Sequence, residues 1–206
     1  MKNGPIYVAA EKLVKTGYYT NLVELIKHVF ALLCTKLDKK MDVIWAKSLA
    51  IDIYIFLKWL VVSILWFKSS DSLVGLLIAC YLLWSNVFTY FYYHVWDNRQ
   101  SNSISWQRRR FVSLFQSIAF NVFGFAYLFR FFGFNDFKWE LSVESTLFGK
   151  DVLSILYSSL NLFGSGSTIA SPLNLNGVIL LTIQIIITFI FLTLILTNTQ
   201  INKEEK

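Results

Sequence analysis

Apolar residues gather into four long runs that are separated by short polar segments. The runs cover residues 49–67, 72–96, 111–132 and 177–198. An α-helix of about 20 apolar residues is long enough to cross a hydrocarbon core of about 30 Å. The pattern therefore predicts an all-α integral membrane protein with four transmembrane helices.

A different pattern precedes the first run. From residue 21 onward, apolar side chains recur every three or four positions, which is the period of one helix face. These residues are Leu22, Leu25, Ile26, Val29, Phe30, Leu33 and Leu37. Thr20 or Asn21 is suited to cap the start of the helix. We expect an amphipathic helix within residues 1–48, and the sequence leaves open whether it lies on the membrane surface or packs beneath the transmembrane body.

The composition agrees with a membrane protein. Hydrophobic residues make up 55% of the chain and charged residues only 16%, which excludes an ordinary soluble domain. The two cysteines and two histidines form no cluster with the spacing of metal ligands, so neither a metal nor another cofactor is expected. The net charge of +6 comes from basic residues beside the apolar runs, a position typical of topology signals, and no nucleic-acid partner is expected.

The distribution of lysine and arginine predicts the orientation of the chain. Fourteen of them lie before the first run, between the second and third runs or after the fourth. Four lie toward the other side, in the two remaining connections or, for Arg130, near the far end of the third run. Arg108, Arg109 and Arg110 directly precede the third run. Cytoplasmic segments carry the excess of basic residues. We therefore expect a multi-pass protein of the cell membrane with both termini in the cytoplasm.

One charged residue lies near the middle of the first run. An ionised lysine at the position of Lys58 costs about 3 kcal/mol at the centre of a bilayer. Asp52 is too far along the helix to lie on the same face one turn away. Two interpretations remain open. Lys58 is either a sensor or the partner of a carboxylate on another subunit, or its long stem carries the ammonium to the interface or into a wet interior.

The stretch from Asp151 to Pro172, between the third and fourth runs, holds an apolar segment too short to cross a membrane. Residues from Asp151 to Asn161 predict about three helical turns, with the Asp151 carboxylate at the positive end of the helix dipole. A loop with two glycines follows, and then Pro172. This arrangement predicts a re-entrant pore loop. Non-helical backbone at membrane depth persists only where protein buries it or where it lines a wet cavity.

The order of outer helix, short helix, glycine-x-glycine loop, proline and inner helix resembles the pore module of the potassium-channel superfamily. The resemblance extends over residues 111–198, and the two preceding apolar runs would be additional to that module. It implies a selectivity filter formed by Leu162, Phe163, Gly164, Ser165, Gly166 and Ser167.

The filter matches the family only in part. Where the family has Thr-Val-Gly-Tyr-Gly-Asp, this chain keeps both glycines, Gly164 and Gly166. Leu162 replaces the threonine, Ser165 the tyrosine and Ser167 the aspartate. Loss of the threonine removes one ring of oxygens, and loss of the aromatic brace loosens the loop. The resemblance therefore implies cation permeation and leaves potassium selectivity open.

Further expectations follow from the resemblance. It implies a homotetramer in membrane lipid that conducts monovalent cations, with Asp151, Tyr157 and Asn161 in the pore helix. Thr188 and Thr193 would line the pore from the inner helix. The chain would then comprise a cytoplasmic amphipathic region (1–48), a two-helix hairpin with a basic loop (49–110), a pore domain (111–198) and a cytoplasmic tail (199–206).

A second hypothesis belongs to a different class. The chain would be a non-conducting interaction or accessory protein of the membrane, and its Gly-Ser-Gly-Ser sequence would be a flexible turn. An enzyme is not expected, because the sequence contains no HExxH zinc motif, no GxSxG elbow and no facing pair of aspartates in its apolar runs.

Overall fold

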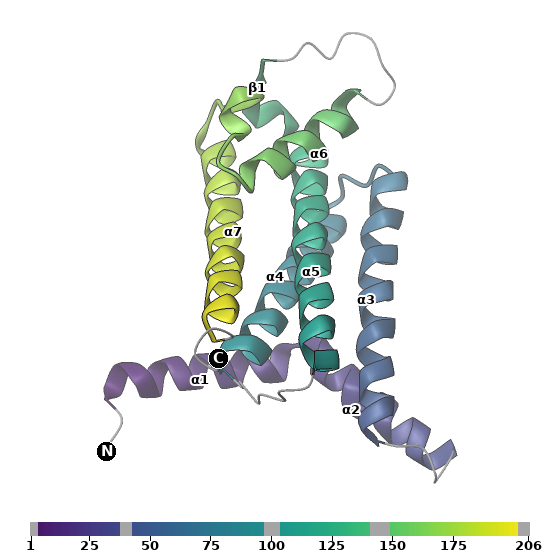
Figure 1. Cartoon of the computed structure of the whole chain (residues 1–206). Helices are drawn as coiled ribbons and strands as arrows, with labels where there is room; N and C mark the ends of the chain where they lie inside the picture. The colour runs from purple at the N-terminus through teal and green to yellow at the C-terminus, as the bar shows by residue number, and fades with distance from the viewer. Residues whose placement is uncertain (1–3, 38–42, 97–103, 141–148, 202–206) are drawn as a thin grey trace. The chain divides into compact units, whose positions relative to one another are not determined.

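The computed structural model describes residues 4–37, 43–96, 104–140 and 149–201, and the chain is mostly helical (Figure 1). Four helices are long and apolar enough to cross a membrane, over Trp45–Phe67, Leu73–Phe91, Phe111–Phe131 and Leu175–Thr193. The four helices predicted from the apolar runs are confirmed. Their number and apolar composition indicate a multi-pass membrane protein.

Some predicted features lie outside the described residues. These are part of the basic loop, including Arg99, the end of the tail from residue 202, and the basic residues Lys2, Lys39 and Lys40. The orientation of the chain and its division into functional segments stay predictions.

The chain divides into two compact units. The first comprises Met1–Val61 and Trp84–Arg99, and the second comprises Val62–Leu83 and Gln100–Lys206. Two of the spanning helices, α3 (Val43–Phe67) and α4 (Leu73–Phe91), therefore contribute residues to both units: the end of α3 and the start of α4 belong to the second unit, and the remainder of each helix belongs to the first.

In the first unit, two helices precede the first span. α1 extends over Pro5–Thr20 and α2 over Leu22–Leu37. α2 is the predicted amphipathic helix, whereas α1 was not predicted. The α4 helix continues into a π-helical turn, η1 (Tyr92–Trp96).

Asn21 joins the N-terminal helices to α4. Its Oδ1 atom accepts a hydrogen bond from the backbone N–H of Val23 at 3.2 Å and so caps α2. The same oxygen accepts one from Ser85 Oγ at 2.9 Å, and Asn21 Nδ2 donates to Thr89 Oγ1 at 2.7 Å. One asparagine thus caps α2 and holds it against α4.

Lys58 is buried inside the first unit. The residue is only 5% exposed. Its Nζ atom donates a hydrogen bond to Asn86 Oδ1 on α4. One turn away, Tyr54 Oη and Ser85 Oγ are 2.8 Å apart. Lys58 therefore points into the protein, and its ammonium does not reach the membrane interface along the outer surface of α3.

The second unit contains the remaining elements. They are α5 (Ile104–Phe131), η2 (Phe134–Asp136), β1 (Phe137–Trp139), α6 (Gly149–Asn161), η3 (Gly166–Thr168), β2 (Ala170–Pro172) and α7 (Leu175–Ile201). Figure 1 shows α6 lying obliquely against α5 and α7. β1 and β2 pair antiparallel with Lys138 opposite Ser171. This sheet was not predicted, because strands of three residues are too short to display an alternating pattern.

The start of α7 is fixed by a cap and a close approach. Asn174 Oδ1 accepts a hydrogen bond from the backbone N–H of Gly177 at 3.0 Å, which makes Asn174 the N-cap. A Cβ atom at Gly177 would lie 2.6 Å from the carbonyl oxygen of Asp136. Glycine therefore allows α7 to begin directly beside the end of η2.

Candidate pore-loop site

α6 confirms the short helix predicted between the third and fourth spans. Its first turn is held by an ion pair between Arg130 Nε on α5 and Asp151 Oδ1, at 2.7 Å. Asp151 lies where a carboxylate complements the helix dipole, as predicted. Farther along α6, the fully buried Tyr157 packs edge-on against Phe129 of α5 and Phe137 of β1, with ring centroids 4.8 and 5.3 Å apart. Tyr157 is thus a core residue of the second unit.

The last turn of α6 contacts the middle of two spans. Ser158 Oγ donates to the backbone carbonyl of Val122 on α5 at 2.7 Å. Gln184 on α7 donates from Nε2 to the carbonyl and hydroxyl oxygens of Ser158, at 2.9 and 2.8 Å. Asn161 Nδ2 donates to Gln184 Oε1 at 2.9 Å. Val122 and Gln184 are central in their spans, so the end of α6 lies level with the middle of both.

These polar side chains are buried among apolar residues. Gln184 is 2% exposed, and Ser158 and Asn161 are also buried. A buried polar group costs free energy unless it is hydrogen-bonded. The amide of Gln184 satisfies this condition by bonding to two residues of α6 at once, and it therefore fixes the depth and rotation of α6 against α7.

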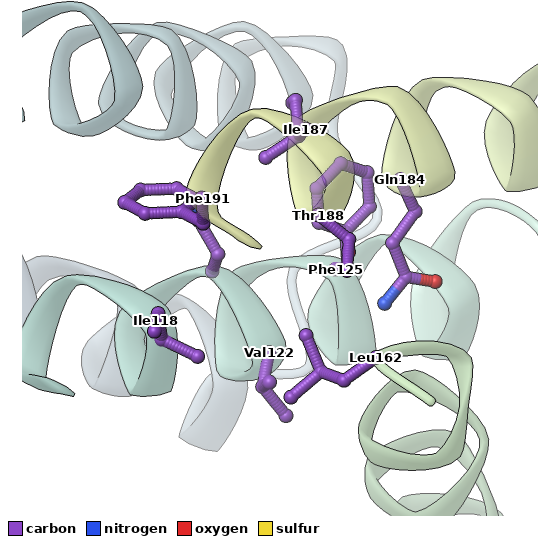
Figure 2. A pocket seen from close by; sticks show the side chains of 9 residues that line it. Ile118, Val122, Phe125, Leu162, Gln184, Ile187, Thr188 and Phe191 are labelled. Atoms are coloured by element: carbon purple, nitrogen blue, oxygen red, sulfur yellow. The ribbon is translucent and has the colours of Figure 1, made fainter. Parts of the chain in front are cut away.

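A small cavity lies beside this network, between α5, α7 and the residue that follows α6 (Figure 2). Its volume is about 10 Å³, which is at the lower limit for one water molecule. Its lining residues are Ile118, Asn121, Val122, Phe125, Leu162, Gln184, Ile187, Thr188 and Phe191. This cavity is too small to be an ion path through a single chain.

The loop after α6 begins with a helix cap. The backbone N–H of Ser165 donates to the carbonyl of Leu160 at 3.0 Å, and that of Gly164 donates to the carbonyl of Asn161 at 3.3 Å. These two bonds form a Schellman motif, in which the residue at the position of Gly164 adopts the left-handed conformation. Gly164 has a φ of +71°. Glycine is favoured there because it has no Cβ atom.

Gly166 has a different role. It is buried, and a Cβ atom at this position would overlap the side-chain oxygen of Asn161. Its carbonyl accepts a hydrogen bond from Ile169 N–H at 2.9 Å, and the carbonyl of Ser165 accepts one from Thr168 Oγ1 at 2.8 Å. These two carbonyls are therefore engaged within the loop.

The structure brings some of the predicted site residues together and separates others. Asn161, Leu162 and Thr188 lie around the same network and cavity. Phe163 is 81% exposed, and Gly164, Ser165 and Ser167 are exposed as well. Thr188 is buried within the chain. Thr193 is exposed on α7, with its hydroxyl donating to the carbonyl of Phe189 at 2.9 Å.

Three residues that position α6 were not among the predicted site residues. They are Arg130, Ser158 and Gln184. The sequence could have indicated Gln184 and Arg130 as candidate site residues, because each is a polar residue within an apolar run. Ser158 carries none, since serine is common in helices and its partners come from other parts of the chain.

A charged cluster in the first unit is centred on Glu24. Its carboxylate accepts hydrogen bonds from Lys27 Nζ at 2.8 and 3.1 Å and from the hydroxyl of Tyr93. Burial alone would raise the pKa of this carboxyl. The hydrogen bonds from Lys27 and Tyr93 and the charge of Lys27 outweigh burial and hold the pKa below its usual value.

We expect the stability of the protein to depend on the ionisation of Glu24. Because the pKa is lowered in the folded state, the stabilisation is fully present above the unfolded-state value of about 4.3 and is lost as the pH falls through the folded-state pKa. The thermal unfolding midpoint of Glu24→Gln should be lower than that of the wild type at neutral pH and should lack this acid dependence. Glu11→Gln is the matched control, since Glu11 pairs with Lys15 on the surface of α1. Identical acid dependence in wild type and Glu24→Gln would contradict the expectation.

Within the parts of the chain that the structure describes, no three His, Cys, Asp or Glu residues gather to hold a metal ion. Comparison with protein-family models, with curated proteins and with solved structures finds no match.

Proposed function

We propose that this chain is a subunit of a cation channel in which the loop after α6, from Leu162 to Ser167, lines a pore shared by four copies. The observation that carries the proposal is the depth of α6, whose last turn bonds to Val122 and Gln184 in the middle of two spans. The segment from α6 to β2 would then enter the membrane and return to the same side.

The exposure of the loop supports a shared pore. Phe163, Ser165 and Ser167 follow α6 directly and are exposed in a single chain. Irregular backbone at membrane depth must be covered by protein or line a wet cavity. Copies of the chain arranged around an axis meet both conditions. The carboxyl end of α6 would direct its partial negative charge toward the pore and favour cations.

The hydrogen bonds within the loop bear on selectivity. The carbonyls of Ser165 and Gly166 accept hydrogen bonds from donors of the loop itself, so these two carbonyls are less available to an ion. The exposed Ser165 and Ser167 add hydroxyl oxygens. We therefore propose a weakly selective cation pore, because selection of potassium relies on a dense set of backbone carbonyls.

A second candidate is a non-conducting membrane interaction protein. The Schellman motif at Gly164 and the contact of Gly166 with Asn161 favour it, because they account for both glycines without a pore. In this case the exposed loop would contact a different membrane protein.

Cation flux through the purified full chain in liposomes separates the two candidates. A channel gives a flux down a potassium or sodium gradient and a reversal potential with the sign of a cation. Gly164→Asn should reduce this flux, because a side chain added at the exposed Gly164 projects away from the chain and would enter the shared pore. It should preserve the helix cap, because asparagine is the side chain best tolerated in the left-handed conformation after glycine. Lys138→Asn, on the exposed face of β1, is the control and should conduct normally. No flux from a folded wild type would overturn the channel and favour the second candidate.

A further inference from the structure

A polar cavity lies in the first unit, among α1, α2, the start of α3 and the π-helical turn that ends α4. Its volume is about 220 Å³, whereas a single water needs about 10–15 Å³. Its lining side chains are Tyr18, Glu24, Lys27, His28, Lys47, Tyr92 and Tyr93. Every lining residue can donate or accept a hydrogen bond, so the cavity is built for a polar ligand.

Positive charge predominates in this cavity. The single carboxylate of the lining, that of Glu24, is already engaged by Lys27 Nζ and the Tyr93 hydroxyl. Among the residues that the structure describes, Lys47 forms no ion pair. The Lys47 ammonium therefore adds a positive charge that no carboxylate of the cavity neutralises.

Donors outnumber acceptors as well. Burial and the neighbouring Glu24 raise the pKa of Tyr18 and of Tyr93, so both phenols keep their protons at neutral pH. Lysine ammonium groups donate only, and three tyrosine hydroxyls can donate too. Such a set of donors suits the oxygens of an anion.

The cavity lies at the depth of the membrane surface. Lys47 is at the beginning of the first span, Trp45–Phe67, and Tyr92 directly follows the end of the second, Leu73–Phe91. The beginning of one span and the end of the next are on the same side of the bilayer. Lipid phosphates lie at that level, and basic pockets beside spans bind anionic head groups.

We propose that this cavity binds a phosphate group, with Lys47 and His28 as its principal contacts and the Glu24–Lys27–Tyr93 cluster as its fixed wall. The phosphate belongs either to the head group of an anionic phospholipid or to a soluble phosphate compound. The two sources offer the same oxygens to the same donors. The site shares no residue with the loop after α6, and the inference does not depend on whether the chain conducts.

The test is binding to the purified full chain in detergent, measured by native mass spectrometry and by the shift in thermal unfolding midpoint. The probes are short-chain phosphatidylglycerol, phosphatidylcholine of the same chain length, inorganic phosphate and glycerol phosphate. The variants are Lys47→Gln and His28→Gln, with Lys36→Gln as control, since Lys36 is exposed on α2 and does not line the cavity. Helix content is measured for each variant by circular dichroism.

Phosphatidylglycerol should bind more tightly than phosphatidylcholine, and Lys47→Gln should weaken this binding about fivefold, the usual contribution of one lysine at an anionic surface. Lys36→Gln should change it less than Lys47→Gln does. Binding of inorganic phosphate or glycerol phosphate with the same dependence on Lys47 identifies a soluble phosphate as the ligand, and binding of the lipid alone identifies the head group. Equal losses in Lys47→Gln and Lys36→Gln, or no binding of any probe to folded protein, would overturn the proposal.

Discussion

Gly166→Ala is expected to destabilise the second unit more than any other single methyl group added to the loop after α6. The new Cβ atom would overlap the side-chain oxygen of Asn161. Asn161 would have to rotate away and give up its hydrogen bond to Gln184. Overpacking and the loss of a buried hydrogen bond together cost about 2–4 kcal/mol. The thermal unfolding midpoint of the purified protein measures this loss.

Gly164→Ala is the matched control for Gly166→Ala. No atom lies within 4 Å of a Cβ atom at Gly164, so the added methyl group meets only the strain of the left-handed backbone, about 1–2 kcal/mol. The double variant Asn161→Ala/Gly166→Ala should lose less stability than the sum of its single variants, because removal of the Asn161 side chain makes room for the methyl group. Additive losses, or a larger loss for Gly164→Ala, would contradict the loop geometry.

Gln184→Leu is expected to loosen α6 from α7. Leucine occupies a similar volume but offers none of the three hydrogen bonds that Gln184 forms with Ser158 and Asn161. In a bilayer no water replaces these partners, and an interhelical hydrogen bond contributes about 0.6–1.7 kcal/mol there. We therefore expect a loss of about 2 kcal/mol in the free energy of unfolding, measured on the purified protein.

Thr182→Val controls for the change from a polar to an apolar side chain on the same helix, because Thr182 is exposed. It should leave the unfolding midpoint nearly unchanged. Asn161→Leu/Gln184→Leu should be more stable than the sum of the single losses predicts, since replacing both partners leaves neither of them unsatisfied. If Gln184→Leu behaves like Thr182→Val, the network does not hold α6 in place.

The hydrophobic pattern is sufficient to place the spanning helices and α6. The thickness of the bilayer sets the length of an apolar run. The predicted runs match the end of α3 at Phe67 and nearly match the start of α4 at Leu73, whereas α3 begins at Val43 instead of 49 and α4 ends at Phe91 instead of 96. Asn161 was correctly predicted as the end of α6, which a glycine follows. Asp151 lies in the first turn of α6, and the helix begins two residues before it, at Gly149. α2 was predicted from its periodic apolar face.

Other elements had no such signal. α1 was not predicted, and its buried residue, Gly17, lies close to the ring of Phe88 on α4. The strands β1 and β2 are three residues long and exist because they pair with each other. Each of these features depends on a partner that is distant in the sequence.

For the polar residues within the apolar runs, the sequence likewise predicts which positions are unusual but not which residues they contact. The positions of Lys58 and Gln184 mark them as exceptional, because polar side chains are costly inside a membrane. Their partners, Asn86 for Lys58 and the α6 residues Ser158 and Asn161 for Gln184, come from other helices. Periodicity tells which face of a helix a residue occupies, but the packing of helices decides what lies against that face.

The two glycines after α6 make this distinction sharpest. A glycine-x-glycine pattern is compatible both with a filter and with the end of a helix, because both need backbone conformations that other residues avoid. The folded chain assigns Gly164 to the cap of α6 through its φ angle, and Gly166 to the space beside Asn161. Neither role can be predicted from the local sequence, since each depends on where the hydrogen bonds and side chains of α6 lie.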